Sequence, residues 1–186
     1  KILSLSYELS KRQMWSRISS RYSRFSFAEI EKDNSVLEMD VFDSLNTLGE
    51  KIKIELGWNI DQIIASIDNF DVIIVDYIQR MEFEGSDTRK GIDLNMGKLS
   101  NLARDKNKII FVISSMAEGS DNFKESGSIL YMCQSAFFLK RITSNILVLE
   151  NIKNSRGING NNVYLEVDFA HQKIKEASKP ELKEFI

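Results

Sequence analysis

The sequence predicts an α/β fold, built on a mixed, mainly parallel sheet that is flanked by helices and ends in antiparallel strands. Two apolar runs, 71–76 and 109–113, are typical of parallel strands buried on both faces. The helical periodicity of residues 89–106 joins them into a strand–helix–strand unit, and the right-handed crossover rule makes the two strands parallel. Three shorter strand patterns follow at 136–140, 146–151 and 162–168.

The N-terminal third is predicted to be one strand followed by helices. Residues 2–6 form a strand-like apolar run, and residues 11–22 place apolar side chains four apart behind an N-cap at Ser10. Residues 44–56 carry leucine and isoleucine at helical spacing, and a further short helix is predicted at 58–67.

Length and composition indicate one domain. A chain of 186 residues with 42% apolar content is long enough to bury a substantial core. We expect this core to cover residues 1–175 and to be followed by a charged tail over 176–186. Because the sequence opens at Lys1 without methionine and enters a strand pattern at once, we expect it to be part of a larger protein.

Charge and cysteine usage narrow the class of protein. The formal net charge is -2 and the pI is about 5.6, so contact with a polyanion has to be local. Cys133 stands alone, which excludes an internal disulfide framework and fits the reducing cytoplasm. No stretch approaches the roughly 18 apolar residues of a membrane span, and no secretory signal opens the chain.

Acidic residues follow two of the predicted strands. Asp76 ends a buried strand, at the sheet edge where open α/β folds bind ligands, and could hold Mg²⁺ beside nucleotide phosphates. Glu8 follows the first strand and could polarise an attacking water molecule. On these residues alone, an aspartate that caps a strand and a surface glutamate favoured by a helix dipole remain open alternatives.

The sequence reads S-Y-E-L-S at 6–10 and D-Y-I-Q at 76–79. These two stretches resemble the S-L-E-M-S and D-Y-L-Q blocks in the C-terminal motor domain of DnaB-type replicative helicases, a RecA-like ATPase core. In all, five blocks stand in the order and approximate spacing of that family. Stretches at 99–103, 124–129 and 153–160 resemble its L-K-x-L-A, R-E-S-G-A-I and K-N-R-x-G-x-x-G blocks.

The resemblance implies an ATP-dependent DNA helicase that moves along single-stranded DNA in replication as a hexameric ring. ATP and Mg²⁺ are the implied cofactors, and a primase or a helicase loader is an implied partner besides the other subunits. The implied site residues are Glu8, Lys153 and Arg156 in catalysis, Asp76 as a water-mediated Mg²⁺ ligand, and Gln79 and Ser115 in nucleotide sensing. Lys153 and Arg156 reach the nucleotide of the neighbouring subunit in this arrangement.

DNA contact in this family runs through loops that correspond here to residues 80–90 and 118–127. The implied DNA-binding residues are Arg80, Arg89, Lys90, Lys124, Ser126 and Gly127. A few cations per subunit suffice when six subunits share one strand. Acidic residues in the same loops leave open the alternative of a solvated loop of mixed charge.

The sequence also departs from the family pattern. No G-x-x-x-x-G-K-[ST] phosphate-binding loop occurs, and because the family places it just upstream of the first strand, we expect truncation and an inactive isolated chain. The S-Q-L-N-R block appears as S-S-M-A-E at 114–118, and an extra Ser155 displaces Arg156. The alternative is a catalytically degenerate RecA-like module that binds DNA or a replication partner without hydrolysing ATP; a recombination or clock-type ATPase is a third option.

Overall fold

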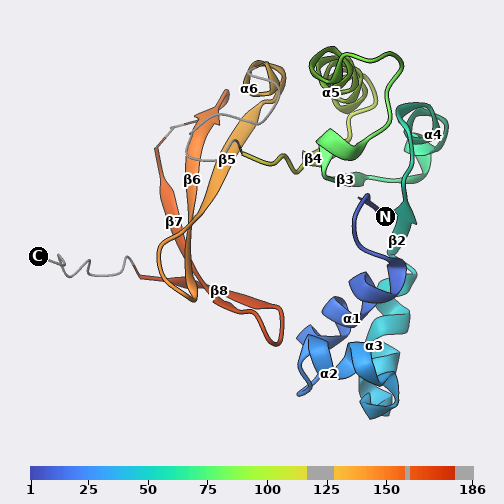
Figure 1. Cartoon of the computed structure of the whole chain (residues 1–186), viewed down its shortest axis with the longest axis vertical. Coiled ribbons are helices and arrows are strands. Elements are labelled where there is room, and N and C mark those ends of the chain that lie inside the picture. Colours follow the sequence, from blue (N-terminus) through green and yellow to red (C-terminus); the bar gives the residue numbers. More distant parts are fainter. Residues whose placement is uncertain (117–127, 158–159, 179–186) are drawn as a thin grey trace, which may run out of the picture. The chain divides into compact units, whose positions relative to one another are not determined.

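A computed structural model of the chain describes residues 1–116, 128–157 and 160–178 (Figure 1). The described residues fall into two compact units. The first unit comprises Lys1–Trp15 and Glu38–Cys133, and the second unit comprises Ser16–Leu37 and the part of the chain from Gln134. Among the described residues, no helix combines the length and the apolar character needed to cross a bilayer.

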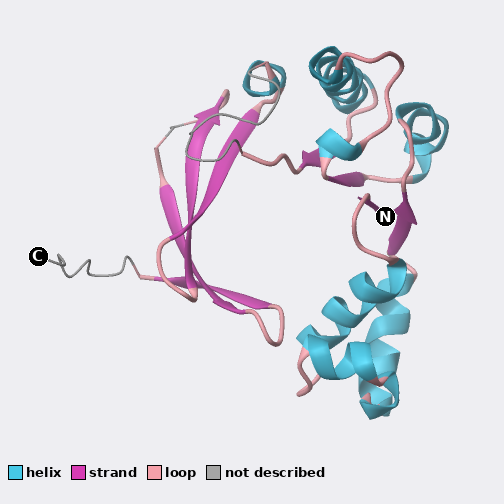
Figure 2. Ribbon diagram, viewed as in Figure 1, coloured by secondary structure: helices cyan, strands magenta, loops and turns pink. Residues whose placement is uncertain are grey.

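The first unit contains a parallel sheet of four strands in the order β2-β1-β3-β4 (Figure 2). The strands are β1 (Ile2–Ser6), β2 (Ile52–Leu56), β3 (Val72–Asp76) and β4 (Ile109–Val112). In the register of this sheet, Ile2 lies opposite Ile52 on one side and Val72 on the other. The parallel part of the predicted fold is confirmed.

Helices connect the parallel strands. They are α1 (Lys11–Tyr22), which begins in the first unit, α3 (Met39–Gly49), α4 (Ile60–Ser66) and α5 (Thr88–Asp105), with 3₁₀ turns η2 (Ile67–Asn69) and η3 (Ile78–Arg80). A short helix of the same unit, α6 (Ile129–Met132), comes after β4. The predicted cap at Ser10 is confirmed, because its hydroxyl accepts the Gln13 backbone N–H while the Gln13 side chain accepts the Ser10 N–H. Asn59 and Gln62 form the same reciprocal capping box at α4.

The core of the first unit lies between one face of the sheet and the helices that cover it. Leu3 and Leu5 of β1 and Ile73 and Val75 of β3 are fully buried on this face. The other members of the cluster are Ile60, Ile63, Ile67, Phe70, Ile78, Met81, Ile92, Met96, Leu99 and Ile129. Full burial of such side chains stabilises the fold by roughly 1.5–3 kcal/mol each, so the carboxyl edge of the sheet rests on a well-packed support.

Two predictions for the first unit are wrong in detail. The helix predicted over 44–56 ends at Gly49, and Ile52–Leu56 forms β2, because apolar side chains four residues apart satisfy both the helical and the alternating pattern. The run at 109–113 was predicted to be buried on both faces, but only one face is partly buried. Ile110 and Val112 pack against the core, whereas Ile109 and Phe111 are each 58% exposed.

The second unit contains an antiparallel sheet in the order β5-β6-β7-β8 (Figure 2). Its strands are β5 (Ser135–Arg141), β6 (Ile146–Asn154), β7 (Asn162–Asp168) and β8 (Lys173–Ala177), and its helical segments are the end of α1, α2 (Phe27–Lys32) and the 3₁₀ turn η1 (Asn34–Val36). The predicted α/β class with antiparallel strands at the C-terminal end is confirmed. The parallel and antiparallel strands form separate sheets, however, where one mixed sheet was predicted.

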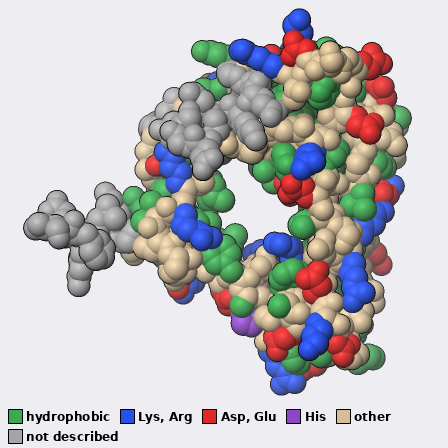
Figure 3. All heavy atoms as spheres, viewed as in Figure 1, with side chains coloured by type: hydrophobic (Ala, Val, Ile, Leu, Met, Phe, Trp, Pro, Cys, Tyr) green, Lys and Arg blue, Asp and Glu red, His purple; other side chains and the backbone are tan. Residues whose placement is uncertain are grey.

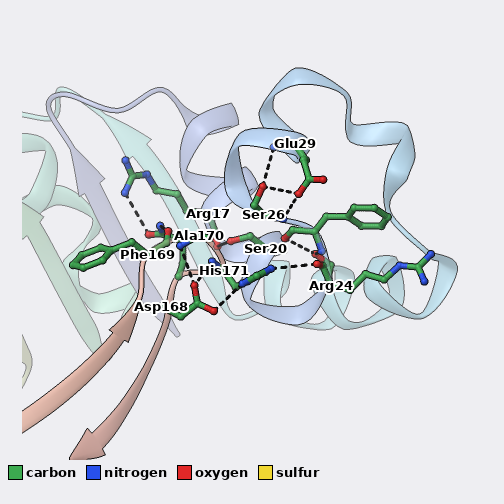
Figure 4. A network of polar contacts seen from close by, with 12 residues as sticks. Arg17, Ser20, Arg24, Ser26, Glu29, Asp168, Phe169, Ala170 and His171 are labelled. Carbon is green, nitrogen blue, oxygen red and sulfur yellow. Dashed lines mark hydrogen bonds and ion pairs between the residues drawn. The ribbon is translucent and has the colours of Figure 1, made fainter. Parts of the chain in front are cut away.

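Hydrogen bonds join the β7–β8 turn to the helices of the second unit (Figure 4). The Phe27 backbone N–H donates to the Ala170 carbonyl at 2.8 Å. His171 places Nδ1 at 2.7 Å from an Asp168 carboxylate oxygen and Nε2 at 3.2 Å from the Arg24 carbonyl. The hydrogen bond with His171 is the main reason that the pKa of Asp168 is lowered. His171 therefore has a structural role in the second unit.

Candidate functional site

The two acids singled out by the sequence lie at the same edge of the parallel sheet. Ser6 and Asp76, the last residues of β1 and β3, are opposite one another in register. The Tyr7 N–H donates to the Asp76 carbonyl at 3.0 Å and extends the pairing by one residue. Glu8 comes next, in a turn closed by a hydrogen bond from the Leu9 N–H to the Ser6 hydroxyl at 3.0 Å.

Asp76 and Glu8 differ in their access to water. Asp76 is partly buried where β3 leaves the sheet, whereas Glu8 is exposed in the turn after β1. Both residues follow strands whose inward-facing side chains belong to the core, so the position of the edge is fixed by burial. The arrangement offers two carboxylates at the carboxyl end of adjacent parallel strands, where α/β sheets place ligand-binding groups.

Tyr77 connects this edge to the segment that follows β3. Its hydroxyl donates to Glu8 Oε1 at 2.9 Å and accepts a hydrogen bond from Arg80 Nε at 2.9 Å. The bond to Tyr77, and to a smaller extent the charge of Glu8, raises the pKa of Arg80. Sequence reasoning assigned no role to Tyr77, because its contact with Glu8 joins residues 69 positions apart.

Gln79 connects the ends of β3 and β4. Its side-chain N–H donates to the Ser114 hydroxyl at 2.7 Å, and its side-chain carbonyl accepts the Ser115 backbone N–H at 3.3 Å. The structure thus brings together Gln79 and Ser115, the two residues implied in nucleotide sensing. Ser115 takes part through its backbone, and the serine hydroxyl in contact is that of Ser114.

Tyr7 lies beneath this edge as a half-buried residue. Its hydroxyl donates to the Trp58 carbonyl. Burial, and secondarily the negative charge of Glu82, raises the pKa of Tyr7 far above its ordinary value. Tyr7 therefore stays neutral and packs against the core that supports Glu8.

The described cations implied in DNA binding are all exposed. Arg80 ends η3, and Arg89 and Lys90 lie in the first turn of α5, which Asp87 caps by accepting the Lys90 N–H at 3.1 Å. This hydrogen bond lowers the pKa of Asp87. Basic and acidic side chains are intermixed on the visible surface, so any cationic contact is local (Figure 3).

The segment between η3 and α5 is packed onto the helix. Met81 is buried, and Asn95 of α5 donates its side-chain N–H to the Glu82 carbonyl at 3.2 Å. Gly91 leaves space for the Phe83 ring, which would overlap a side chain at that position. These contacts hold the start of the predicted DNA-binding segment against α5.

Lys153 and Arg156 lie at the end of β6 in the second unit. Lys153 is opposite Ala136 of β5, and the Arg156 N–H donates to the Asn154 side chain at 3.1 Å in the following turn. The Arg156 side chain is exposed. Lys124, Ser126 and Gly127, also implied in DNA binding, lie outside the described residues.

The donor set at the sheet edge fits Mg²⁺ bound together with a phosphate ligand. Within the described part of the chain, no group of three or more histidine, cysteine, aspartate or glutamate side chains gathers around a metal-sized site. Mg²⁺ in nucleotide-binding proteins is commonly held by one or two carboxylates, by waters and by the phosphates themselves. Asp76 at the end of β3 supplies one such carboxylate.

Comparisons with known proteins identify the fold. No protein-family profile matches the chain. The chain is similar to a probable replicative DNA helicase of Guillardia theta, with 22% identity over 176 residues. It is also similar to a solved DnaB-like replicative helicase, described with its interactions with primase, with a TM-score of 0.76 and 16% identity over 93% of this chain. The chain has the fold of a DnaB-type RecA-like domain.

A second solved structure has a similar fold. The RadB recombinase superposes with a TM-score of 0.60 at 15% identity, over 96% of this chain and 79% of its own. The chain spans 29% of the length of the Guillardia theta relative and 49% of the solved helicase chain. The comparisons therefore establish a RecA-like fold of the DnaB type.

Proposed function

We propose that this domain is the motor of an ATP-dependent helicase that translocates along single-stranded DNA in replication. The observation that carries the proposal is the placement of Glu8 and Asp76 at one edge of the parallel sheet. The similarity to two replicative helicases supports a role in replication. ATP and Mg²⁺ are the proposed cofactors.

The proposed chemistry divides between the two carboxylates. Asp76 would hold Mg²⁺ through water, and the ion would offset charge on the β and γ phosphates. Glu8 would orient the water that attacks the γ phosphorus as the bond to ADP breaks. Gln79, bonded to both Ser114 and Ser115, is suited to transmit a change at the phosphate to the end of β4.

The phosphate cradle has to come from another segment. The sequence contains no G-x-x-x-x-G-K-[ST], the motif whose backbone N–H groups and lysine bind the phosphates. We therefore propose that these residues by themselves do not turn over ATP, and that hydrolysis requires a phosphate-binding loop joined to them.

Further proposals concern assembly. Lys153 and Arg156 would contact the nucleotide of a neighbouring subunit in a hexameric ring, where a planar guanidinium pairs well with phosphate oxygens. The solved DnaB-like helicase was described with its interactions with primase, which supports a primase as partner. The residues that would contact single-stranded DNA are Arg80, Arg89 and Lys90, together with Lys124, Ser126 and Gly127. The cytoplasm is the proposed location of the protein.

Glu8→Gln tests the proposal in the protein that joins this domain to its phosphate-binding loop. The amide keeps the size of the side chain but cannot act as the base, so we expect ATP affinity to be retained and turnover to fall by about 10²–10⁴. Steady-state ATPase assays and nucleotide titrations measure the two effects. Glu50→Gln, an exposed acid at the end of α3, is the matched control. Normal turnover in Glu8→Gln would remove Glu8 from the site.

One observation favours the second candidate, a RecA-like module that binds DNA or a replication partner without hydrolysing ATP. The S-S-M-A-E sequence at 114–118 stands where the resembled family has S-Q-L-N-R. A protein of this second kind would bind single-stranded DNA or a replication partner such as primase while showing no turnover of ATP, with or without DNA. ATPase assays in the presence and absence of DNA separate the two candidates.

A further inference from the structure

A chain of two hydrogen bonds joins a proposed DNA-binding residue to the proposed catalytic carboxylate. Arg80 Nε donates to the Tyr77 hydroxyl oxygen at 2.9 Å, and that hydroxyl donates to Glu8 Oε1 at 2.9 Å. We propose that Tyr77 is a positioning residue that restrains Glu8 until Arg80 binds a DNA phosphate. This inference rests on the proposed function and adds a regulatory step to it.

The backbone holds all three residues of the chain in place. The Tyr7 N–H bonds the Asp76 carbonyl and so sets Glu8 beside the start of the Tyr77 segment. Arg80 follows Tyr77 by one 3₁₀ turn, and its N–H donates to the Tyr77 carbonyl at 3.1 Å. Side chains three residues apart in such a turn lie on the same side, which explains the contact between Arg80 and Tyr77.

Charge makes the two bonds depend on one another. A phenol hydroxyl can donate only one hydrogen bond, and here the Tyr77 hydroxyl donates it to Glu8. Donation from the Arg80 cation to the phenol oxygen polarises the O–H bond and strengthens the bond to Glu8. The Glu8 oxygen that accepts this hydrogen bond is less available to bind a water molecule.

DNA phosphate is a better partner for Arg80 than a neutral phenol. A guanidinium can match two phosphate oxygens at once through charge-assisted bonds, whereas Tyr77 offers one neutral acceptor. When Arg80 moves to a phosphate, the Tyr77 bond to Glu8 weakens and Glu8 is released to orient water. Binding of DNA would in this way raise the rate of hydrolysis.

The coupling is tested without nucleotide, through the affinity for single-stranded DNA. Fluorescence anisotropy with a labelled oligo(dT) compares the wild type with Tyr77→Phe, Glu8→Ala and the double variant. Tyr77→Phe removes the acceptor of the Arg80 side chain, and Glu8→Ala weakens that acceptor and removes the charge that attracts Arg80. We therefore expect affinity to rise about two- to fivefold, the effect of one exposed charged contact. The double variant should bind no more tightly than the better single variant, because both changes break the same chain.

Two controls separate this coupling from a general charge effect. Glu82→Ala removes another exposed acid of the same segment, which acts electrostatically on Tyr7, and its effect should add to that of Tyr77→Phe. In an Arg80→Ala background, Tyr77→Phe should leave DNA affinity unchanged. Circular dichroism establishes that each variant is folded.

A second readout is DNA stimulation of ATPase activity, in the protein with its phosphate-binding loop. Tyr77→Phe should raise turnover without DNA and reduce the ratio of stimulated to basal turnover towards one. Unchanged affinity in Tyr77→Phe, or additive effects of Tyr77→Phe and Glu8→Ala, would overturn the coupling and leave the proposed function standing. A wild-type protein that binds no single-stranded DNA would instead overturn the proposed function, and the coupling with it.

Discussion

At the scale of single residues, Tyr7 shows how the core controls the chemistry of the sheet edge. Its hydroxyl bonds the Trp58 carbonyl, and burial raises its pKa. A tyrosine whose pKa is higher in the folded than in the unfolded chain stabilises the fold below the unfolded value of about 10. That stabilisation is lost as pH rises above this value, because the folded state then binds more protons than the unfolded state.

Replacing Tyr7 with phenylalanine should therefore flatten the alkaline end of the stability profile. In the wild type, we expect the free energy of unfolding to fall as pH is raised above 10, and in Tyr7→Phe to fall less. Urea unfolding followed by circular dichroism between pH 8 and about 11 measures both curves. Tyr22→Phe, at a side chain that is 50% exposed, is the control and should follow the wild type. Identical slopes in wild type and Tyr7→Phe would contradict the effect of burial.

Asp76 and Glu8 were predicted from the sequence as site residues, whereas Tyr77 was missed. The difference is that Tyr77 is defined by a contact between distant parts of the sequence. Asp76 and Glu8 could be singled out because each follows a strand pattern, which is a local feature. Tyr77 could not, because its partner Glu8 lies 69 positions away and becomes adjacent only when β1 pairs with β3.

At the scale of secondary-structure elements, α5 carries two glycines in very different surroundings. Gly91 faces the Phe83 ring, which leaves no room for a side chain, whereas an added Cβ at Gly97 would meet nothing within 4 Å. Both lie inside an 18-residue helix, where glycine has lower intrinsic propensity than alanine. Packing therefore explains the first glycine and leaves the second without a structural requirement.

Substitution by alanine should have opposite effects at these two positions. Gly91→Ala should lower the free energy of unfolding by about 1–3 kcal/mol, because the new methyl group displaces Phe83. Gly97→Ala should raise it by about 0.5–1 kcal/mol through helix propensity alone. Urea unfolding measures both, and in a Phe83→Ala background Gly91→Ala should no longer lower the free energy of unfolding. Equal effects of the two substitutions would show that Phe83 does not pack as described.

Helices were predicted correctly where the apolar periodicity and a capping residue indicated the same element. They were predicted wrongly where one apolar spacing fitted both a helix and a strand. The helix at 11–22 has both an apolar period and the Ser10 cap, and it appears with those bounds. The segment 52–56 was assigned to a helix because Ile52 and Leu56 are spaced for either structure. β8 was missed because it is charged and its pairing with β7 is tertiary information.

At the scale of the whole molecule, charge is balanced and binding to a polyanion depends on a few positions. The net charge is -2, with 25 basic and 27 acidic residues. Each phosphate contact to single-stranded nucleic acid contributes about 0.7 to the salt dependence of the binding constant. The exposed cations at the start of α5 are thus expected to have a measurable share of that dependence.

Reversing Arg89 and Lys90 to glutamate should weaken single-strand binding and flatten its salt dependence. Loss of two phosphate contacts would reduce the slope of log affinity against log salt by about 1.4. Anisotropy titrations over a range of salt concentrations measure it. The matched control reverses Arg104 and Lys106 at the other end of the helix, where they pair with Asp105 and Asp68. An unaltered slope in the Arg89 and Lys90 variant would assign DNA contact to other residues.

The overall architecture was predictable in outline because local patterns determine class and order. Buried runs joined by a helix imply parallel strands, and short strands with turn signals imply antiparallel ones. That β4 and β5 end different sheets was not predictable, because a strand at a sheet end and a central strand can share one apolar pattern. The predicted division at residue 175 stays a prediction.

His171 can report on the second unit through its proton NMR signals, because its ring contacts two segments of that unit. The sequence contains one histidine, so a proton NMR spectrum shows one pair of imidazole ring signals. The ring bonds Asp168 of β7 and the carbonyl of Arg24 after α1, and its chemical shifts depend on both. Any ligand or subunit that alters this junction would shift this one pair of signals, without labelling of the protein.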